Sequence, residues 1–281
     1  MKTQEAMFPL ERMAKVLGVS KSGYYAFRSR RESVRDKARR LLDVRVKAAF
    51  EDSHGRSGSV KIAHALTAGG HATSRRRATD AMRRQGLVSK VRRKFTVTTQ
   101  SAHRLAPAPN LLNRMFDVEA PNKVWVSDIT YLPSRSGWLY LVVFIDLFSR
   151  RLVGWQVSDS LAHDTVLTAL ERAVHRRRPG PGLLIHSDRG VQYCCDGFRE
   201  VIGRHRFIQS MSRKGNCWDN AVAESFFRTL KTEWAYHIDL TDLEHARREL
   251  FEYIERFYNH QRLHATLDYL SPAVFERRKT G

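Results

Sequence analysis

The chain has 281 residues, which is long enough for one large domain with a sizeable core and a smaller domain beside it. No apolar stretch approaches the ~20 residues that a membrane span needs, and the N-terminus lacks the apolar segment of a secretory signal, so we expect a soluble protein without a membrane partner. The 49 Lys and Arg residues exceed the 29 Asp and Glu residues, and the net charge of +20 favours nucleic acid as a partner.

The basic excess lies in the N-terminal part of the chain. Residues 1–120 hold 26 basic and 10 acidic residues, whereas residues 121–281 hold 23 and 19. This distribution predicts a DNA-gripping module followed by a nearly balanced one. The three cysteines, Cys194, Cys195 and Cys217, fit neither a disulfide framework nor a zinc site, which indicates thiols in a reducing cytoplasm.

Residues 9–28 predict a small helix-turn-helix. Gly18 ends the first predicted helix, and Ser20 is a candidate N-cap of the second. The apolar residues of the first helix recur at helical spacing: Leu10, Met13, Ala14 and Leu17. Such a unit can place its second helix in a DNA major groove. An ordinary helical hairpin fits equally well, and the two interpretations stay open.

Three helices are predicted next, over residues 33–53, 57–70 and 74–86. Ser74 is the candidate N-cap of the third, and Arg75, Arg76 and Arg77 stand in its first turn. The helix dipole favours acids at this position, so three cations there cost stability unless phosphates neutralise them. These three arginines are therefore predicted DNA contacts.

Residues 95–122 are rich in Thr, Ala and Pro and predict a linker, whose length argues for a domain boundary nearby. Strands are predicted beyond it over 124–131, 139–146, 150–157, 182–187 and 206–210, and helices over 163–176, 196–204, 220–234 and 242–258. Short turns between the first three strands suggest an antiparallel meander, and the later alternation with helices suggests parallel additions. Thr241 and Glu244 predict a capping box for the last helix.

Three carboxylates stand out in this part of the chain. Asp128 lies inside the strand VWVSDITYLP, and Asp188 ends the apolar run GLLIHSD. Glu224 lies in DNAVAESFFRTLKTEW, where a rotation of about 100° per residue places it with Arg228 and Lys231, opposite the apolar flank. Strand ends and a helix surface are rigid mounts, which suit a metal site.

Carboxylates are ligands that Mg²⁺ prefers. Two such ions about 3.5–4 Å apart activate the attacking oxygen and stabilise the leaving oxygen in phosphodiester displacement. Counted alone, however, 29 acids make some triple inevitable, and a single acid is more often a solvated surface charge. The choice between these interpretations depends on the sequence around each acid.

That sequence resembles the DDE integrase core of bacterial insertion-sequence transposases, in particular the second-reading-frame protein of elements with two overlapping frames. The resembling segments are VWVSDITYLP, LVVFIDLFSRRLVGW, IHSDRGVQY, SRKGNCWDNAVAESFFRTLKTE and RFYNHQRLHATLDYLSPAVFE. The 35 residues between Asp188 and Glu224 are a spacing typical of that family. GRSGSVKI and ATSRRRATDAMRRQGL are similar to the family's upstream helical module.

The resemblance implies an α/β fold: a ribonuclease-H-like (retroviral integrase) core with a mixed five-stranded sheet, preceded by all-α helix-turn-helix modules. We expect four segments along the chain. They are an N-terminal helix-turn-helix segment (1–32), a helical DNA-binding module (33–94), a linker (95–122) and the catalytic core with a C-terminal helix (123–281).

The activity that the resemblance implies is Mg²⁺-dependent cleavage of DNA 3′ ends and strand transfer at the terminal inverted repeats of an insertion sequence. Asp128, Asp188 and Glu224 would hold two Mg²⁺ ions, for which Mn²⁺ would substitute. The implied partners are double-stranded DNA (element ends and target), further copies of the chain on paired ends, and the upstream frame's product. The expected location is the bacterial cytoplasm, at the nucleoid.

Further residues have predicted roles around the three acids. Lys214, Arg228 and Lys231 are predicted DNA contacts. Lys214 and Trp218 lie in a segment that resembles the family's flexible active-site loop, where Trp218 either stacks on a flipped base or packs against the core.

Four further polar residues lie in the segments that resemble the family. We expect Asp146 to be structural or to support the site, and Asp219 and Asn220 to cap the helix that carries Glu224. His186 shares a strand face with Asp188 and either orients phosphate or is an ordinary hydrogen-bonded histidine.

Two other function classes stay open. One is a DNA-binding subunit without turnover that inhibits or helps a full transposase, although the intact acids argue against an inactive relic. The other is a nuclease of the same fold, although the helical modules favour sequence-specific DNA over RNA–DNA hybrids. A joining assay with a labelled DNA end separates strand transfer from hydrolysis.

Overall fold

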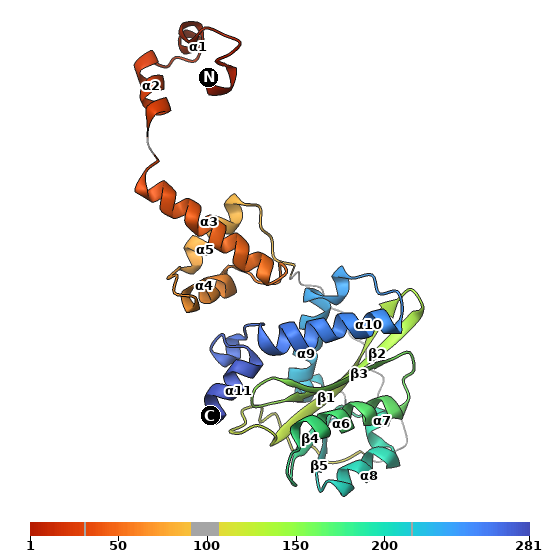
Figure 1. Ribbon diagram of the computed structural model, residues 1–281. Helices are drawn as coiled ribbons and strands as arrows, with labels where there is room; N and C mark the ends of the chain where they lie inside the picture. Colours follow the sequence, from red (N-terminus) through yellow and green to blue (C-terminus); the bar gives the residue numbers. More distant parts are fainter. Residues whose placement is uncertain (31, 91–106, 215) are drawn as a thin grey trace.

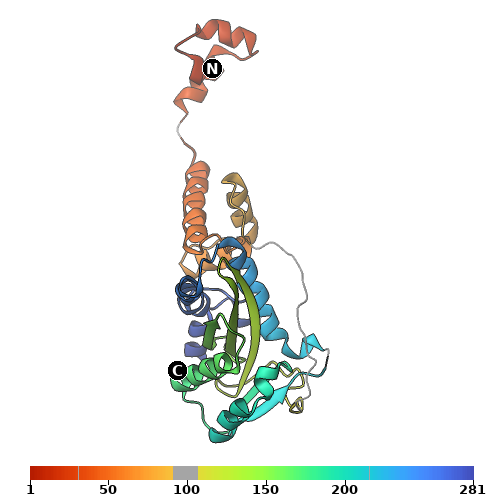
Figure 2. The ribbon, with the colours of Figure 1, turned by 90° about the vertical axis from the view of Figure 1, so that its right-hand side faces the viewer.

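The computed structural model describes residues 1–30, 32–90, 107–214 and 216–281. Figure 1 shows three parts in chain order: a helical N-terminal arm, a three-helix module and an α/β core. The N-terminus lies far from the core, at the outer end of the arm, in both views (Figures 1 and 2). Within the described ranges no helix is both long and apolar enough to cross a bilayer.

The arm consists of the predicted pair of helices, α1 (Leu10–Val16) and α2 (Lys21–Ser29). Gly18 has a φ of 64°, in the left-handed region that glycine adopts at no steric cost, and the chain turns there. The Ser20 hydroxyl accepts a hydrogen bond of 3.0 Å from the Gly23 N–H, which confirms the predicted N-cap.

The helical module contains α3 (Val34–Asp52), α4 (Ser59–Ala68) and α5 (Arg75–Arg84), which confirms the three predicted helices. Ser74 caps α5 by accepting a hydrogen bond of 3.3 Å from the Arg77 N–H. The helices enclose a small apolar core: Leu42, Val46, Ile62, Ala63, Leu66, Ala78, Ala81 and Met82. Because α4 and α5 share this core, they form one packed unit.

The core sheet has five strands in the order β3-β2-β1-β4-β5. They are β1 (Val124–Ser134), β2 (Gly137–Asp146), β3 (Leu152–Ser158), β4 (Leu184–Ser187) and β5 (Ile208–Met211). The pairs β1–β2 and β2–β3 are antiparallel, whereas β1–β4 and β4–β5 are parallel. This confirms the predicted meander with parallel additions and the mixed sheet of the expected fold.

Helices cover both faces of the sheet (Figure 1). One face packs against α6 (His163–Arg177) and α8 (Asp196–Arg204), and the other against α9 (Ala221–Glu233) and α10 (Leu243–Phe251). Alternate residues of a strand face opposite sides. In β1, Trp125 therefore packs on the α6 side and Val126 on the α9 side.

The cap of α10 differs from the predicted capping box. Asp242, not Thr241, is the N-cap residue, and its carboxylate accepts a hydrogen bond of 2.8 Å from the His245 N–H. The Thr241 hydroxyl instead donates to that same carboxylate at 2.8 Å. Aspartate is a stronger N-cap than threonine, and the extended backbone of Asp242 places it at the helix entrance.

Three elements were not predicted in this form. The helix expected to reach residue 258 continues beyond α10 as a π-helical segment, Glu252–Tyr258. A short helix, α7 (Val191–Cys194), follows the Asp188 turn, and α11 (Pro272–Thr280) ends the chain.

Part of the predicted linker packs on the core. Residues 95–106 lie outside the described residues, but Leu112 is 3% exposed within the core cluster on the α9 face. The backbone N–H of Leu111 donates a hydrogen bond of 2.9 Å to the Ser210 hydroxyl of β5.

Candidate active site

Two of the predicted acids stand next to each other because of the strand register. Ser127 of β1 pairs with Ser187 of β4 in a parallel ladder, and Asp128 and Asp188 are the next residues. Neighbouring strands lie about 4.8 Å apart, so these two carboxylates leave adjacent backbones. Asp128 follows Val126 by two residues and thus faces the α9 side of the sheet.

The electrostatics of Asp128 reflect this crowding. Its partial burial raises the pKa of the carboxyl well above the usual range, and the negative charges of Asp188 and Glu224 raise it further. The Ile129 N–H, which donates to the carboxylate at 2.9 Å, and the positive charge of Lys231 act in the opposite direction. Repelling carboxylates favour a proton or a bound cation between them.

A buried hydroxyl pair joins β1 to α7, the short helix that follows the Asp188 turn. The Tyr193 hydroxyl of α7 and the Ser127 hydroxyl lie 2.7 Å apart, and both residues are fully buried. Burial raises the pKa of Tyr193, and the charges of Asp188 and Asp128 raise it further. The tyrosine therefore stays protonated and holds α7 against β1.

Glu224 approaches the same place from the first turn of α9, which packs against β1. Its side chain is exposed, although burial still raises the pKa of its carboxyl. Within the described part of the chain, no three His, Cys, Asp or Glu side chains gather closely enough to hold an ion. The fold thus brings Glu224 into the electrostatic neighbourhood of Asp128 without closing a three-ligand cluster.

Asn220 and Asp219 do not cap α9 as predicted. Asn220 occupies the N-cap position, but its side chain makes no capping bond and donates to the Ser127 carbonyl at 3.0 Å. It therefore ties the start of α9 to β1, one residue before Asp128. The bond from Nδ2 to the strand orients the side chain, and Oδ1, the atom that a cap would use as acceptor, has no hydrogen-bond partner among the described residues.

Asp219 is instead the fully buried centre of an ion-pair network. Its two oxygens accept from Arg213 Nε (2.9 Å) and Nη2 (2.7 Å) and from Arg114 Nε (2.8 Å). Asn110 Nδ2 donates to it at 2.8 Å. Hydrogen bonds from Arg213 are the main reason that the pKa of Asp219 lies well below its usual range. Arg213 is only six residues away, but Arg114 and Asn110 are 105 and 109 residues away, so the sequence around Asp219 did not indicate this network.

The predicted DNA contacts of the core differ in their surroundings. Lys231 is half-buried, and burial lowers its pKa while the charge of Asp128 opposes that effect, so Lys231 faces the site. Arg228 and Lys214 are exposed. Trp218 is 69% exposed, so of its two predicted alternatives the packed one is wrong.

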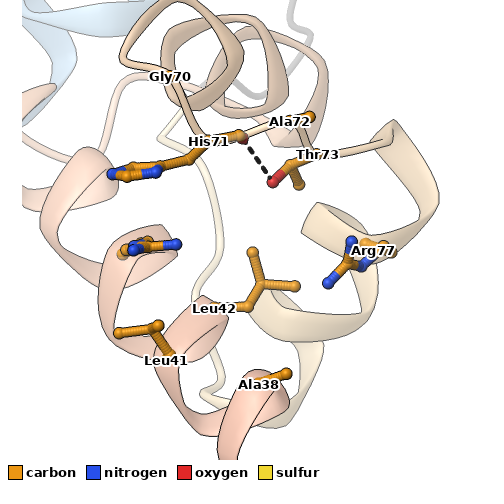
Figure 3. A pocket seen from close by; sticks show the side chains of 9 residues that line it. Ala38, Leu41, Leu42, Gly70, His71, Ala72, Thr73 and Arg77 are labelled. Carbon is orange, nitrogen blue, oxygen red and sulfur yellow. Dashed lines mark hydrogen bonds between the residues drawn. The ribbon is translucent and has the colours of Figure 1, made fainter. Parts of the chain in front are cut away.

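The predicted DNA contacts of the module, Arg75, Arg76 and Arg77, are all exposed on the first turn of α5. Arg77 also lines a hollow of about 300 Å³ between α3, the turn before α5, and α5 itself. In Figure 3, Leu42 rises between His71 and Arg77. The full lining is Ala38, Leu41, Leu42, Arg45, Gly70, His71, Ala72, Thr73 and Arg77.

Two further predicted residues have structural roles. Asp146, the last residue of β2, is fully buried beside Trp125 at the start of β1, where its carboxylate accepts from the Asn122 N–H at 2.8 Å and the Trp125 indole at 3.3 Å. His186 is buried between the Ser210 and Ser212 hydroxyls, 2.8 and 3.2 Å from its ring nitrogens, so it is the hydrogen-bonded strand histidine of the two alternatives.

Comparisons with known proteins match both the helical module and the core. Two models of integrase core domains match residues 118–217 and 205–272, and an HTH-like domain model matches residues 36–95. The chain is also similar to solved retroviral structures. A simian T-cell lymphotropic virus intasome chain has 17% identity and a TM-score of 0.48 over 76% of this chain and 70% of that chain. The HTLV-2 integrase catalytic core in complex with magnesium has 15% identity and a TM-score of 0.43 over 56% and 97%.

Relatives with curated names match over nearly the whole chain. The transposase InsF for insertion sequence IS3A of Escherichia coli is 39% identical over 276 residues, which is 98% of this chain and 96% of that protein. The transposase for insertion sequence element IS904 of Lactococcus lactis is 39% identical over 88% of this chain and 98% of that protein. The chain therefore belongs to the IS3 family of insertion-sequence transposases, with an integrase core domain behind an HTH-like domain.

Proposed function

We propose that this transposase cleaves DNA 3′ ends at the terminal inverted repeats of its own element and joins them to a target. Asp128, Asp188 and Glu224 are its catalytic residues. The observation that carries the proposal is the parallel register of Ser127 and Ser187, which makes Asp128 and Asp188 neighbours on the face that α9 covers. The names of the relatives support transposition, and the acids supply its chemistry.

The donor set fits a divalent cation. Mg²⁺ is usually held by one or two carboxylates together with substrate phosphate oxygens, and Asp128 and Asp188 provide two adjacent carboxylates. A pair of bound ions would supply charge stabilisation for the attacking and leaving oxygens, and Mn²⁺ would substitute. Because no three-ligand cluster is closed within the described ranges, we propose that Glu224 joins the aspartates only when DNA is bound.

The chain's own residues have separate tasks in this proposal. The closely spaced carboxylates of Asp128 and Asp188 would hold the metal ions. Asn220 keeps α9, which carries Glu224, against β1, which carries Asp128. Lys231, which faces Asp128, holds the DNA backbone beside the reacting phosphate, and Arg228 and Lys214 extend that basic surface. No protein nucleophile is needed, because water attacks the phosphodiester in the cleavage step, and the 3′ hydroxyl that this step releases attacks the target phosphodiester in the joining step.

DNA is held at a second place by the helical module. Arg75, Arg76 and Arg77 are exposed on the first turn of α5, where phosphates would neutralise both the side chains and the helix dipole. The partners that we propose are double-stranded element ends and target DNA, further copies of the chain on the paired ends, and the upstream frame's product.

The test is a joining assay with labelled element ends, target DNA, and Mg²⁺ or Mn²⁺. We expect joined products from the wild-type chain and none from Glu224→Gln, with end binding unchanged in both. Joining by Glu224→Gln at the wild-type rate would contradict the proposal. Cleaved ends that are never joined would instead indicate a nuclease of the same fold.

A further inference from the structure

The helical module touches the core through a small set of polar and aromatic side chains. Lys61 Nζ of α4 lies 3.7 Å from Oε1 of Glu233, the last residue of α9. One turn later, the His64 ring stacks on Tyr269, with 3.7 Å between centroids and 10° between planes. We call this contact the docking seam, together with Arg56, whose guanidinium lies 4.4 Å from the Phe257 ring centre.

The core side of the docking seam is a buried charge cluster. Glu233 is 3% exposed and accepts hydrogen bonds from Arg262 Nε at 2.9 Å and Nη2 at 2.8 Å, and from the Tyr253 hydroxyl at 3.2 Å. Burial lowers the pKa of Lys61 to about 8 and the charge of Arg262 acts in the same direction, whereas Glu233 opposes it. Lys61 is thus still mostly protonated at neutral pH, with Glu233 as its compensating carboxylate.

The stacked tyrosine sits in a strained turn. Asp268 and Tyr269 are consecutive non-glycine residues with φ values of 52° and 56°. Residues other than glycine rarely adopt this left-handed backbone conformation, and it persists where surrounding contacts hold it in place. The ring of His64, which covers Tyr269, is such a contact.

We propose that Lys61 and His64 are positioning residues, which through the docking seam fix where the helical module presents DNA relative to Asp128, Asp188 and Glu224. This inference rests on the proposed function. α4 and α5 share one apolar core, so the Arg75–Arg77 turn moves with α4. Lys61 reaches the far end of α9, the helix on which Glu224 stands. Fixing the helical module against the core removes orientational freedom between the bound DNA and the three acids, and such freedom slows a reaction.

The docking itself is testable in the full-length chain without DNA. Lys61→Glu places a second carboxylate against buried Glu233, and Lys37→Glu makes the same charge change at an exposed position of α3. We expect faster amide hydrogen exchange over residues 264–270 in Lys61→Glu and in His64→Ala, and wild-type exchange in Lys37→Glu and Lys61→Arg. Equal exchange in Lys61→Glu and Lys37→Glu would overturn the inference.

The consequence for the reaction is measured at saturating element ends. We expect Lys61→Glu to bind the ends with the Kd of Lys37→Glu but to cleave them about 100-fold more slowly, and Lys61→Arg to restore the rate. Equal cleavage by both Glu variants, or loss of binding in step with cleavage, would overturn the inference. His64→Ala, at an exposed position, carries the same test if Lys61→Glu does not fold. A wild-type chain that never cleaves ends would contradict the proposed function, and the exchange measurement would still decide the docking.

Discussion

The Gly190 N–H donates a hydrogen bond of 2.9 Å to the Asp188 carboxylate, and a Cβ at position 190 would lie 3.0 Å from that same oxygen. The backbone of Gly190 has a φ of −61°, which any residue adopts, so the constraint is purely one of space. Glycine therefore allows the turn after β4 to close tightly around a catalytic candidate.

Gly190→Ala should displace the Asp188 carboxylate and lower the joining rate about tenfold, because small misplacements of reacting groups are expensive. The change in thermal stability should be small. Gly203→Ala is the matched control: its added Cβ meets nothing within 4 Å, and alanine in a helix is favourable by roughly 0.5–1 kcal/mol. Equal joining rates for the two variants would contradict the prediction.

The raised pKa of Asp128 makes a stability prediction with a definite sign. A carboxyl whose pKa is higher in the folded chain binds more protons there than in the unfolded chain, so stability falls as pH rises from about 4 toward the folded pKa. Asp128→Asn removes this cost. Without metal at pH 7, we expect Asp128→Asn to have a higher Tm than wild type. Each kcal/mol gained in the free energy of unfolding should raise the Tm by about 2–4 °C. At pH 5 the difference should be smaller.

The control for Asp128→Asn is Asp159→Asn, an exposed aspartate in the loop after β3, whose Tm should match wild type at both pH values. Added Mg²⁺ should raise the Tm of the wild-type chain and not that of Asp128→Asn, because only a folded site gains from ligand. A Tm of Asp128→Asn below that of wild type at pH 7 would contradict the sign.

The strand pattern follows from short-range sequence features, whereas the mixed five-stranded sheet was implied by the family resemblance. The apolar runs around Asp128 and Asp188 predict strands, and the turn spacing predicts which strands are antiparallel. Convergence of the aspartates then needs only the register, since alternation decides the face. Asp219 could not be placed this way. A local cap was the simplest role for an aspartate before a helix, but Arg114 and Asn110 reach it from a distant segment.

Asp219→Asn should destabilise the chain, because it leaves the guanidinium groups of Arg213 and Arg114 without their buried partner. Since both arginines are about half exposed, we expect a loss near the lower end of the range for broken buried pairs, about 3 kcal/mol. Asp239→Asn breaks a solvent-exposed pair with Arg135, which contributes little to stability, so its urea midpoint should stay close to that of wild type. Urea unfolding of both variants measures the difference, and equal midpoints would contradict the role of Asp219.

The salt dependence of end binding should identify the phosphate contacts of α5. The slope of log K against log salt is negative, and its magnitude grows with the number of neutralised phosphates. Replacing an arginine that neutralises one phosphate by alanine should make the slope less negative by about 0.9, for each of Arg75, Arg76 and Arg77. Arg83→Ala, on the last turn of the same helix and 79% exposed, should leave the slope unchanged. If the three first-turn variants have the same slope as Arg83→Ala, the first turn of α5 does not contact DNA phosphates and the prediction is wrong.

Lys231 and Arg228 lie on one helix but should differ in their effect on pH dependence. The positive charge of Lys231 lowers the pKa of Asp128, so Lys231→Ala should raise that pKa further. Asp128 would then ionise only at higher pH, and the rise of joining activity with pH should shift upward. Arg228→Ala, at an exposed position, should weaken DNA binding without moving the profile. Joining rates measured from pH 6 to 9 at saturating DNA decide this. If the two profiles coincide, Lys231 acts as a general DNA contact and not through the charge of Asp128.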